Sequence, residues 1–317
     1  MGGIRSLSLL FIAVALMGAP LSCKTDETYK YDTVVYVKSA SATVYKRPDI
    51  FSETLSTLTF GSKVQGLNEK YRYGVPIDWR KVLLSSGEEG YIEQKYLADG
   101  AFMGRIGQLL DTISSMEPQG EGELKQKARL YIEPSDSSPL IDIVNPLSHV
   151  IIYKKVSSPT GEGNIATADK SGVKKWYLVK TDKGLAGYIP TKNVRLTPPD
   201  EISVYTSVRN AVAWQKIPVE RGEGEGRDYV VSYLGTKAPE GADFDRIEVY
   251  RYDAQSKRYA TVLAKSGLYG LLPLSVAKLD GGVIIKARVM NKKDGRVYIQ
   301  EYSYPPPVRL IREYSEE

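Results

Sequence analysis

Cysteine and histidine are nearly missing from this sequence of 317 residues, which contains only Cys23 and His149. Zinc sites built from several Cys or His ligands are therefore excluded. A Ser-His-Asp triad would need His149, which lies in residues 147–152 (LSHVII), a stretch that predicts the start of a strand. We interpret His149 as a surface or strand-edge residue, and we expect neither a metal site nor a cofactor.

A marked excess of one charge is missing too. The chain holds 43 Lys and Arg against 38 Asp and Glu, a formal net charge of +5. The charges are dispersed, without the long blocks of one sign that indicate nucleic-acid binding. Carboxylates are plentiful, but no spacing singles out the pair that glycoside hydrolysis needs. We therefore expect no nucleic-acid partner and no enzymatic activity.

The one long apolar run is at the N-terminus. Residues 9–17 (LLFIAVALM) follow a single positive charge, Arg5. That length is typical of the hydrophobic region of a signal peptide and falls short of the roughly 20 residues that span a bilayer. Residues 18–20 (GAP) are small or turn-forming and lead to Leu21, Ser22 and Cys23. The pattern predicts an exported chain that is cleaved directly before Cys23.

Residues 20–23 (PLSC) resemble a lipobox, the cleavage motif of bacterial lipoproteins, in the relaxed form familiar among spirochaete lipoproteins. The resemblance implies a signal peptide over residues 1–22, acyl chains on Cys23 that anchor the chain in a membrane, and a tether over residues 23–30. An acylated Cys23 could not serve in a Cys-His dyad. Lys24 follows the cysteine at the position where an inner-membrane retention signal would favour Asp. We therefore expect the protein to be located in the cell envelope, at the outer membrane. The alternative is an ordinary signal peptide followed by an unrelated cysteine.

Tyrosine dominates the aromatic residues, with 23 Tyr against 5 Phe and 3 Trp, and the chain also holds 28 Gly and 17 Pro. This composition, together with many Val residues, is typical of an all-β protein with numerous turns. We therefore expect an all-β fold.

A repeat occupies much of the first two thirds of the chain. The segment ATVYKRP, ending at Pro48, returns as ARLYIEP, ending at Pro134, an offset of 86 residues. Trp79 and Trp176 are 97 residues apart. An offset that steps once indicates a single insertion of 11 residues, which we place in the polar stretch 157–172 because surface loops tolerate added length.

Each copy resembles a bacterial SH3 (SH3b) domain. The motifs that carry the resemblance are a first strand ending in VYxxP or its equivalent, a strand that begins near a Trp, and a closing Gly-Tyr-Ile. The resemblance implies two SH3-like small barrels, over residues 31–100 and 123–197, that bind peptidoglycan or peptides. The glycine before each closing tyrosine would let the backbone bend at a barrel corner.

Six aromatic residues are the candidate ligand contacts: Tyr45, Trp79, Tyr91, Tyr131, Trp176 and Tyr188. SH3-like domains bind peptides through exposed aromatic side chains, so the resemblance implies this role. Small barrels of about 60 residues bury little core, and large rings are also needed inside them. A core role is the favoured interpretation for both tryptophans, Tyr45 and Tyr131.

Residues 101–122 predict a linker with one short amphipathic helix. Apolar residues recur there at three- and four-residue spacing: Phe102, Ile106, Leu109, Ile113 and Met116. We expect this helix to pack onto a neighbouring barrel and residues 118–122 (PQGEG) to end it.

Residues 200–317 predict a C-terminal antiparallel β domain. Strands are expected over residues 211–217, 228–233, 244–252, 258–263, 283–290, 296–302 and 308–311. The loop 291–295 (NKKDG) predicts a bulged hairpin turn with Gly295 in its left-handed position. A β-sandwich or an open barrel fits this order.

Together these patterns predict a membrane-anchored envelope lipoprotein that acts as a non-catalytic binding or scaffolding protein for peptidoglycan or peptides. The first alternative is a surface-exposed adhesin, or a subunit of an envelope complex, that binds envelope or host proteins. The less favoured one is a cell-wall hydrolase with a C-terminal carboxylate site.

Overall fold

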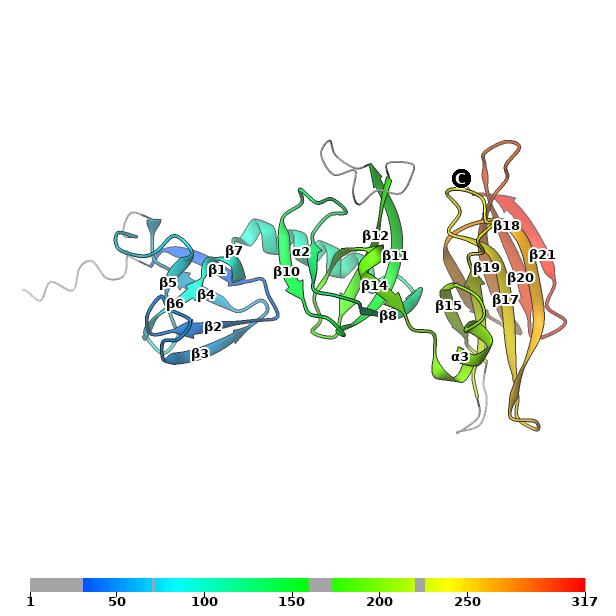
Figure 1. Ribbon diagram of the computed structural model, residues 1–317, viewed down its shortest axis with the longest axis horizontal. Helices are drawn as coiled ribbons and strands as arrows, with labels where there is room; N and C mark the ends of the chain where they lie inside the picture. Colours follow the sequence, from blue (N-terminus) through cyan, green and yellow to red (C-terminus); the bar gives the residue numbers. More distant parts are fainter. Residues whose placement is uncertain (1–30, 70–71, 160–172, 220–225, 317) are drawn as a thin grey trace, which may run out of the picture.

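The computed structural model describes residues 31–69, 72–159, 173–219 and 226–316. The expected signal peptide, Cys23 and the tether lie outside these residues, as does most of the expected insertion. The described chain forms three antiparallel sheets of seven strands each, which follow one another in a row (Figure 1). The predicted all-β fold is confirmed. None of the helices in the described ranges is long and apolar enough to cross a bilayer.

The first unit, residues 31–98, is a sheet with the strand order β3-β2-β6-β5-β4-β1-β7. Its strands are β1 Thr33–Val37, β2 Ser41–Tyr45, β3 Thr54–Thr59, β4 Lys63–Gly66, β5 Trp79–Leu83, β6 Glu89–Glu93 and β7 Leu97–Ala98. Side chains alternate between the two faces of a strand, and the inward ones, such as Val37, Val44 and Val82, form a fully buried core. Tyr31, ahead of β1, is already buried.

The second unit, residues 120–196, has the order β10-β9-β13-β12-β11-β8-β14. Its strands are β8 Gly120–Leu124, β9 Ala128–Tyr131, β10 Leu140–Val144, β11 His149–Pro159, β12 Val173–Thr181, β13 Ala186–Pro190 and β14 Val194–Leu196. Every strand takes the place of the strand seven before it in the first unit. The 3₁₀ turn before the last strand is repeated as well, as η2 Gln94–Tyr96 and η4 Thr191–Asn193. The predicted repeat is therefore confirmed in the topology.

Gly90 and Gly187 precede the closing tyrosines, and the sequence predicted that they let the backbone bend at a barrel corner. The structure gives a different reason why these positions need glycine. Neither adopts a positive φ. A Cβ on Gly90 would lie 2.5 Å from Val44 Cγ1, and a Cβ on Gly187 would lie 2.7 Å from the main-chain oxygen of Tyr131. The missing side chain lets β6 approach β2, and β13 approach β9, more closely than any other residue would allow.

Helix α2, Gly100–Ser114, confirms the predicted linking helix. Asp99 caps its first turn, because the Asp99 carboxylate accepts a hydrogen bond from the Phe102 N–H at 2.7 Å. Ile106 and Ile113 are buried in cores of the second unit, so the helix packs onto that unit as expected. Strand β8 already begins at Gly120, so the end of the expected linker belongs to the second sheet.

The third unit, residues 200–316, begins with helix α3, Asp200–Thr206, which the sequence analysis did not predict. Its seven strands form one antiparallel sheet in chain order from β15 to β21. The strands are β15 Ala211–Ile217, β16 Asp228–Tyr233, β17 Phe244–Asp253, β18 Arg258–Leu279, β19 Gly282–Met290, β20 Val297–Tyr304 and β21 Leu310–Ser315. One core includes Phe244 and Ile285. A second core includes Trp214 and, from α3, Ile202.

Buried polar groups join the second and third units. The main-chain oxygen of Gln119 accepts a hydrogen bond from the Trp214 N–H at 2.9 Å, and its side-chain oxygen accepts one from the Leu274 N–H at 2.8 Å. Lys155 forms an ion pair with Asp243 across the same junction at 2.7 Å. Separating the units would exchange these bonds for bonds to water, so each opposes separation by a net contribution of about 0.5–1.5 kcal/mol.

A smaller junction connects the first and second units. Lys38 Nζ donates a hydrogen bond to the Leu140 carbonyl at 2.6 Å and lies 5.3 Å from the centre of the Phe102 ring on α2. The Ala40 N–H donates to Asp142 at 3.2 Å. Burial lowers the pKa of Lys38. The helix and the two units are therefore in direct contact at this point of the row.

Candidate functional site

The structure brings the three candidate aromatic residues of the first unit together. The rings of Tyr45 and Trp79 meet edge to face, with centroids 5.7 Å apart and planes at 81°. Tyr45 on β2 is the register partner of Tyr91 on β6. Trp79 is 9 % exposed, while Tyr45 and Tyr91 are half-buried. Ring contacts of this kind add about 0.5–1.5 kcal/mol beyond burial, so the set stabilises the junction of β2, β5 and β6.

The second unit repeats this arrangement more tightly. The rings of Tyr131 and Trp176 meet edge to face at 5.6 Å, and Tyr188 is the register partner of Tyr131. Trp176 is only 1 % exposed and Tyr131 is buried. The buried positions agree with the core interpretation of both tryptophans. Little aromatic surface remains for a ligand in this unit.

A groove of about 660 Å³ opens beside Trp79 in the first unit. Its lining residues are Pro48, Asp49, Ile50, Ile77, Asp78, Trp79, Glu93, Gln94 and Lys95. Ile50 is 53 % exposed and Ile77 is 82 % exposed. Three carboxylates face a single cation, Lys95, which forms an ion pair with Glu93 at 2.6 Å. The groove therefore combines exposed apolar side chains with net negative charge.

The second unit holds a cation of its own at the equivalent place. Lys174 lies 97 residues after Ile77, the offset that relates the two tryptophans. Its Nζ is 4.4 Å from the centre of the Trp176 ring and 2.6 Å from both carboxylate oxygens of Asp136. Lys174 is buried. An internal ammonium group thus covers Trp176 where the first unit has an exposed isoleucine beside Trp79.

Of the six predicted contacts, only Trp79 lines the groove. Tyr45 and Tyr91 support it from the neighbouring strands. Ile50, Ile77 and the three carboxylates were not predicted from the sequence. Both isoleucines, Asp49 and Asp78 lie in loops beside the strands, and Glu93 is the last residue of β6. A comparison of the two copies position by position would have found the signal, because Ile77 and Lys174 differ in charge at an otherwise repeated site.

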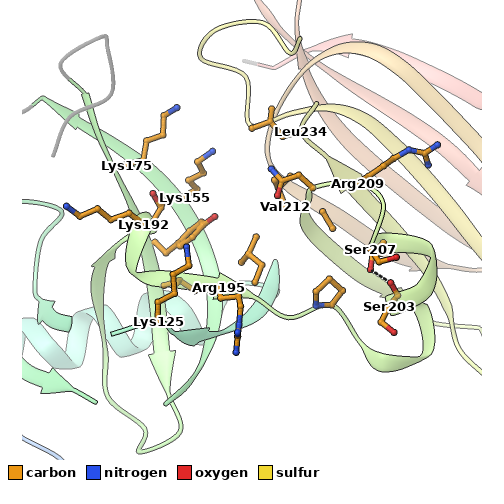
Figure 2. A pocket seen from close by; sticks show the side chains of 18 residues that line it. Lys125, Lys155, Lys175, Lys192, Arg195, Ser203, Ser207, Arg209, Val212 and Leu234 are labelled. Atoms are coloured by element: carbon orange, nitrogen blue, oxygen red, sulfur yellow. Dashed lines mark hydrogen bonds between the residues drawn. The ribbon is translucent and has the colours of Figure 1, made fainter. Parts of the chain in front are cut away.

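A second cleft, of about 640 Å³, lies between the second and third units (Figure 2). Its cationic side chains are Lys125, Lys155, Lys175, Lys192, Arg195 and Arg209. Tyr177 also lines it; burial and the negative charge of Asp243 raise the pKa of Tyr177 to about 12. Its hydroxyl therefore stays protonated at neutral pH and can donate a hydrogen bond.

His149 begins strand β11, as predicted. Its side chain is nearly half exposed, with Nε2 3.1 Å from a carboxylate oxygen of Glu121. In the described ranges, no group of three or more His, Cys, Asp or Glu gathers in a way that could hold a metal ion.

No protein family model matches this chain, and no curated protein matches it. Among solved structures, the chain is similar to NlpC2 from Trichomonas vaginalis, at 14 % identity over 91 % of this chain and 100 % of that one, with a TM-score of 0.18. It is also similar to NlpC1 from the same organism, at 15 % identity over 92 % of this chain and 96 % of that one, with a TM-score of 0.18. Scores this low carry no argument about function.

Proposed function

We propose that this chain is a bacterial envelope lipoprotein, anchored by acyl chains on Cys23, whose two repeated units are non-catalytic binding domains of the SH3b type. Its ligand is a peptide, or the peptide stem of peptidoglycan, held in the groove beside Trp79. The observation that supports this most directly is the combination of exposed isoleucines and carboxylates in that groove.

The groove suits a ligand that carries both apolar and cationic groups. Ile50 and Ile77 expose apolar surface, and covering it contributes roughly 25 cal/mol per Å². The carboxylates of Asp49 and Asp78 attract an ammonium group at a solvated surface, where each such contact contributes about 0–1 kcal/mol. Peptide stems present apolar side chains and amino groups together, whereas an uncharged glycan would leave the carboxylates unused.

The second unit supplies an internal analogue of this interaction. There the Lys174 ammonium lies over the Trp176 ring and against Asp136. A cation over an aromatic face contributes about 0.5–2 kcal/mol, depending on how far it is removed from water. A lysine introduced at position 77 would reproduce this contact in the first unit and compete with a cationic ligand.

The test is co-sedimentation of the full chain with purified peptidoglycan. We expect the natural chain to sediment and Ile77→Lys to weaken the interaction at least tenfold, because the new ammonium occupies the groove. Tyr73→Lys is the matched control: Tyr73 is fully exposed in the same unit but does not line the groove. Equal loss in both variants would mean that net charge, and not the groove, governs binding, and the proposal would fall.

The anchor is tested separately. Cells grown with labelled palmitate should incorporate the label into the chain, and Cys23→Ala should abolish both labelling and membrane partitioning. An unlabelled natural chain would contradict the lipoprotein assignment. If the chain is labelled but does not sediment with peptidoglycan, protein partners become the favoured ligands, and protease treatment of intact cells would show whether the units face the outside.

A further inference from the structure

The cleft between the second and third units collects positive charge from both of its walls. Five of its six cations come from the second unit, and Arg209 comes from the third. Figure 2 shows the labelled lysines on the wall opposite Ser203 of α3 and Ser207, which follows the helix. None of the 18 residues that line it, all within the described ranges, is Asp or Glu. A concave surface of one sign concentrates oppositely charged ligands.

Part of this charge is not neutralised within the chain. Lys155, Arg195 and Arg209 form ion pairs with carboxylates that do not line the cleft. Lys125 and Lys192 are exposed, and no carboxylate of the described residues forms an ion pair with either. These two ammonium groups are therefore available to a bound anion.

Tyr177 adds a directed hydrogen-bond donor to the same cleft. It is only 7 % exposed, yet it lines the cleft. Within the described part of the chain, its hydroxyl donates to no other group. The hydroxyl faces the open cleft, so it can donate a hydrogen bond to an oxygen atom of a ligand there.

The charge of this surface differs between the two copies of the repeat. By the offset of 97 residues, Lys175 and Lys192 occupy the positions of Asp78 and Lys95, which line the acidic groove. One position is acidic in the first unit and basic in the second, and the other is basic in both. The two copies present equivalent edges to ligands of opposite charge.

We infer that the basic cleft binds a ligand through a phosphate group, with Lys125 and Lys192 supplying ammonium groups and Tyr177 donating a hydrogen bond. A phosphate group has more oxygen acceptors and more negative charge than a carboxylate. It can therefore contact several cationic side chains and the Tyr177 hydroxyl at the same time. A volume of about 640 Å³ is typical of small-ligand sites. A phosphorylated sugar or a lipid head group therefore fits this cleft better than a large partner with a flat surface. This inference does not depend on the function proposed for the first unit.

Isothermal titration calorimetry of the full chain tests it with two probes. Pyrophosphate represents soluble phosphate, and dihexanoyl phosphatidylglycerol below its micelle concentration represents a lipid head group. We expect the double variant Lys125→Gln, Lys192→Gln to bind about tenfold more weakly and with a flatter salt dependence. Tyr177→Phe should weaken binding several-fold while keeping the salt dependence.

The matched control is Lys292→Gln, Lys293→Gln, which removes the same charge from exposed positions in a hairpin of the third unit. This variant should bind within twofold of the natural chain. Binding of pyrophosphate or of the lipid that is lost only in the cleft variant supports the inference, and the probe that binds identifies the source of the phosphate. Binding of neither probe, or equal loss in both double variants, overturns it.

Discussion

Replacing Gln119 by alanine should loosen the junction between the second and third units. The Gln119 side chain is buried, and its oxygen accepts the Leu274 N–H at 2.8 Å in a place that water does not reach. In Gln119→Ala this amide loses its acceptor. A buried N–H left unpaired costs about 1–3 kcal/mol. We therefore expect the free energy needed to open the junction to fall by about 2 kcal/mol in this variant.

Hydrogen exchange at Leu274 measures this directly. Because about 1.4 kcal/mol corresponds to a factor of ten, exchange of the Leu274 amide should become roughly 30-fold faster. Gln126→Ala is the control, since Gln126 is exposed and its hydrogen bond to Asn193 at 3.2 Å lies away from Leu274 in the sequence and does not involve it. If Leu274 exchanges at its natural rate in Gln119→Ala, or equally fast in both variants, then Gln119 does not hold the units together.

Three further predictions concern stability. Gly187→Ala should lower the free energy of unfolding by about 2–3 kcal/mol, because the added carbon would lie 2.6 Å from Leu130 Cγ; a urea midpoint equal to that of the natural chain would refute this. Gly104→Ala in α2 should instead raise it by up to about 1 kcal/mol, since open space surrounds that position and alanine favours helix. The hydrogen bond and charge of Lys286 lower the pKa of Glu301, so the stabilisation is present above the ordinary pKa of 4.5 and is lost as the pH falls through the lowered value. Thermal unfolding should therefore separate Glu301→Gln from the natural chain at pH 7, and the difference should shrink as the solution is acidified; a difference that stays constant would contradict this.

The strands with clear alternation could be read from the sequence with accurate bounds. Strands β15 and β16 begin and end where the pattern predicts, and Gly295 has the positive φ, +68°, expected for its turn. These features depend on local chemistry: side chains alternate across a strand, and a left-handed residue in a tight turn is favourably glycine.

Features that depend on tertiary contacts could not be predicted. Only the first part of β18, residues 258–263, was predicted; Gly267 and Pro273, residue types that often interrupt strands, lie further along it. In the structure Pro273 falls where the pairing of β18 with β19 shifts register, so the strand continues past it. Helix α3 is too short for a periodic pattern to be visible in the sequence.

The two clefts show the same limit for the candidate site. The lysines of the basic cleft are far apart in the sequence, and a net charge of +5 gives no hint that they gather on one wall. The aromatic residues could be identified because they recur in both copies. Residues that recur in this way are the ones that the fold itself requires. Ligand chemistry is carried by positions that differ between the copies, such as Ile77 and Lys174.

If Cys23 is acylated as proposed, the order of the three units in the row would place them at different distances from the membrane. Tyr31, already part of the first fold, lies eight positions after Cys23. An extended chain spans at most about 3.6 Å per residue, so the intervening segment reaches roughly 30 Å. With Cys23 acylated, the acidic groove would survey material immediately above the lipid, while the basic cleft would stand further out. One molecule would then sample two depths of the envelope with opposite charges.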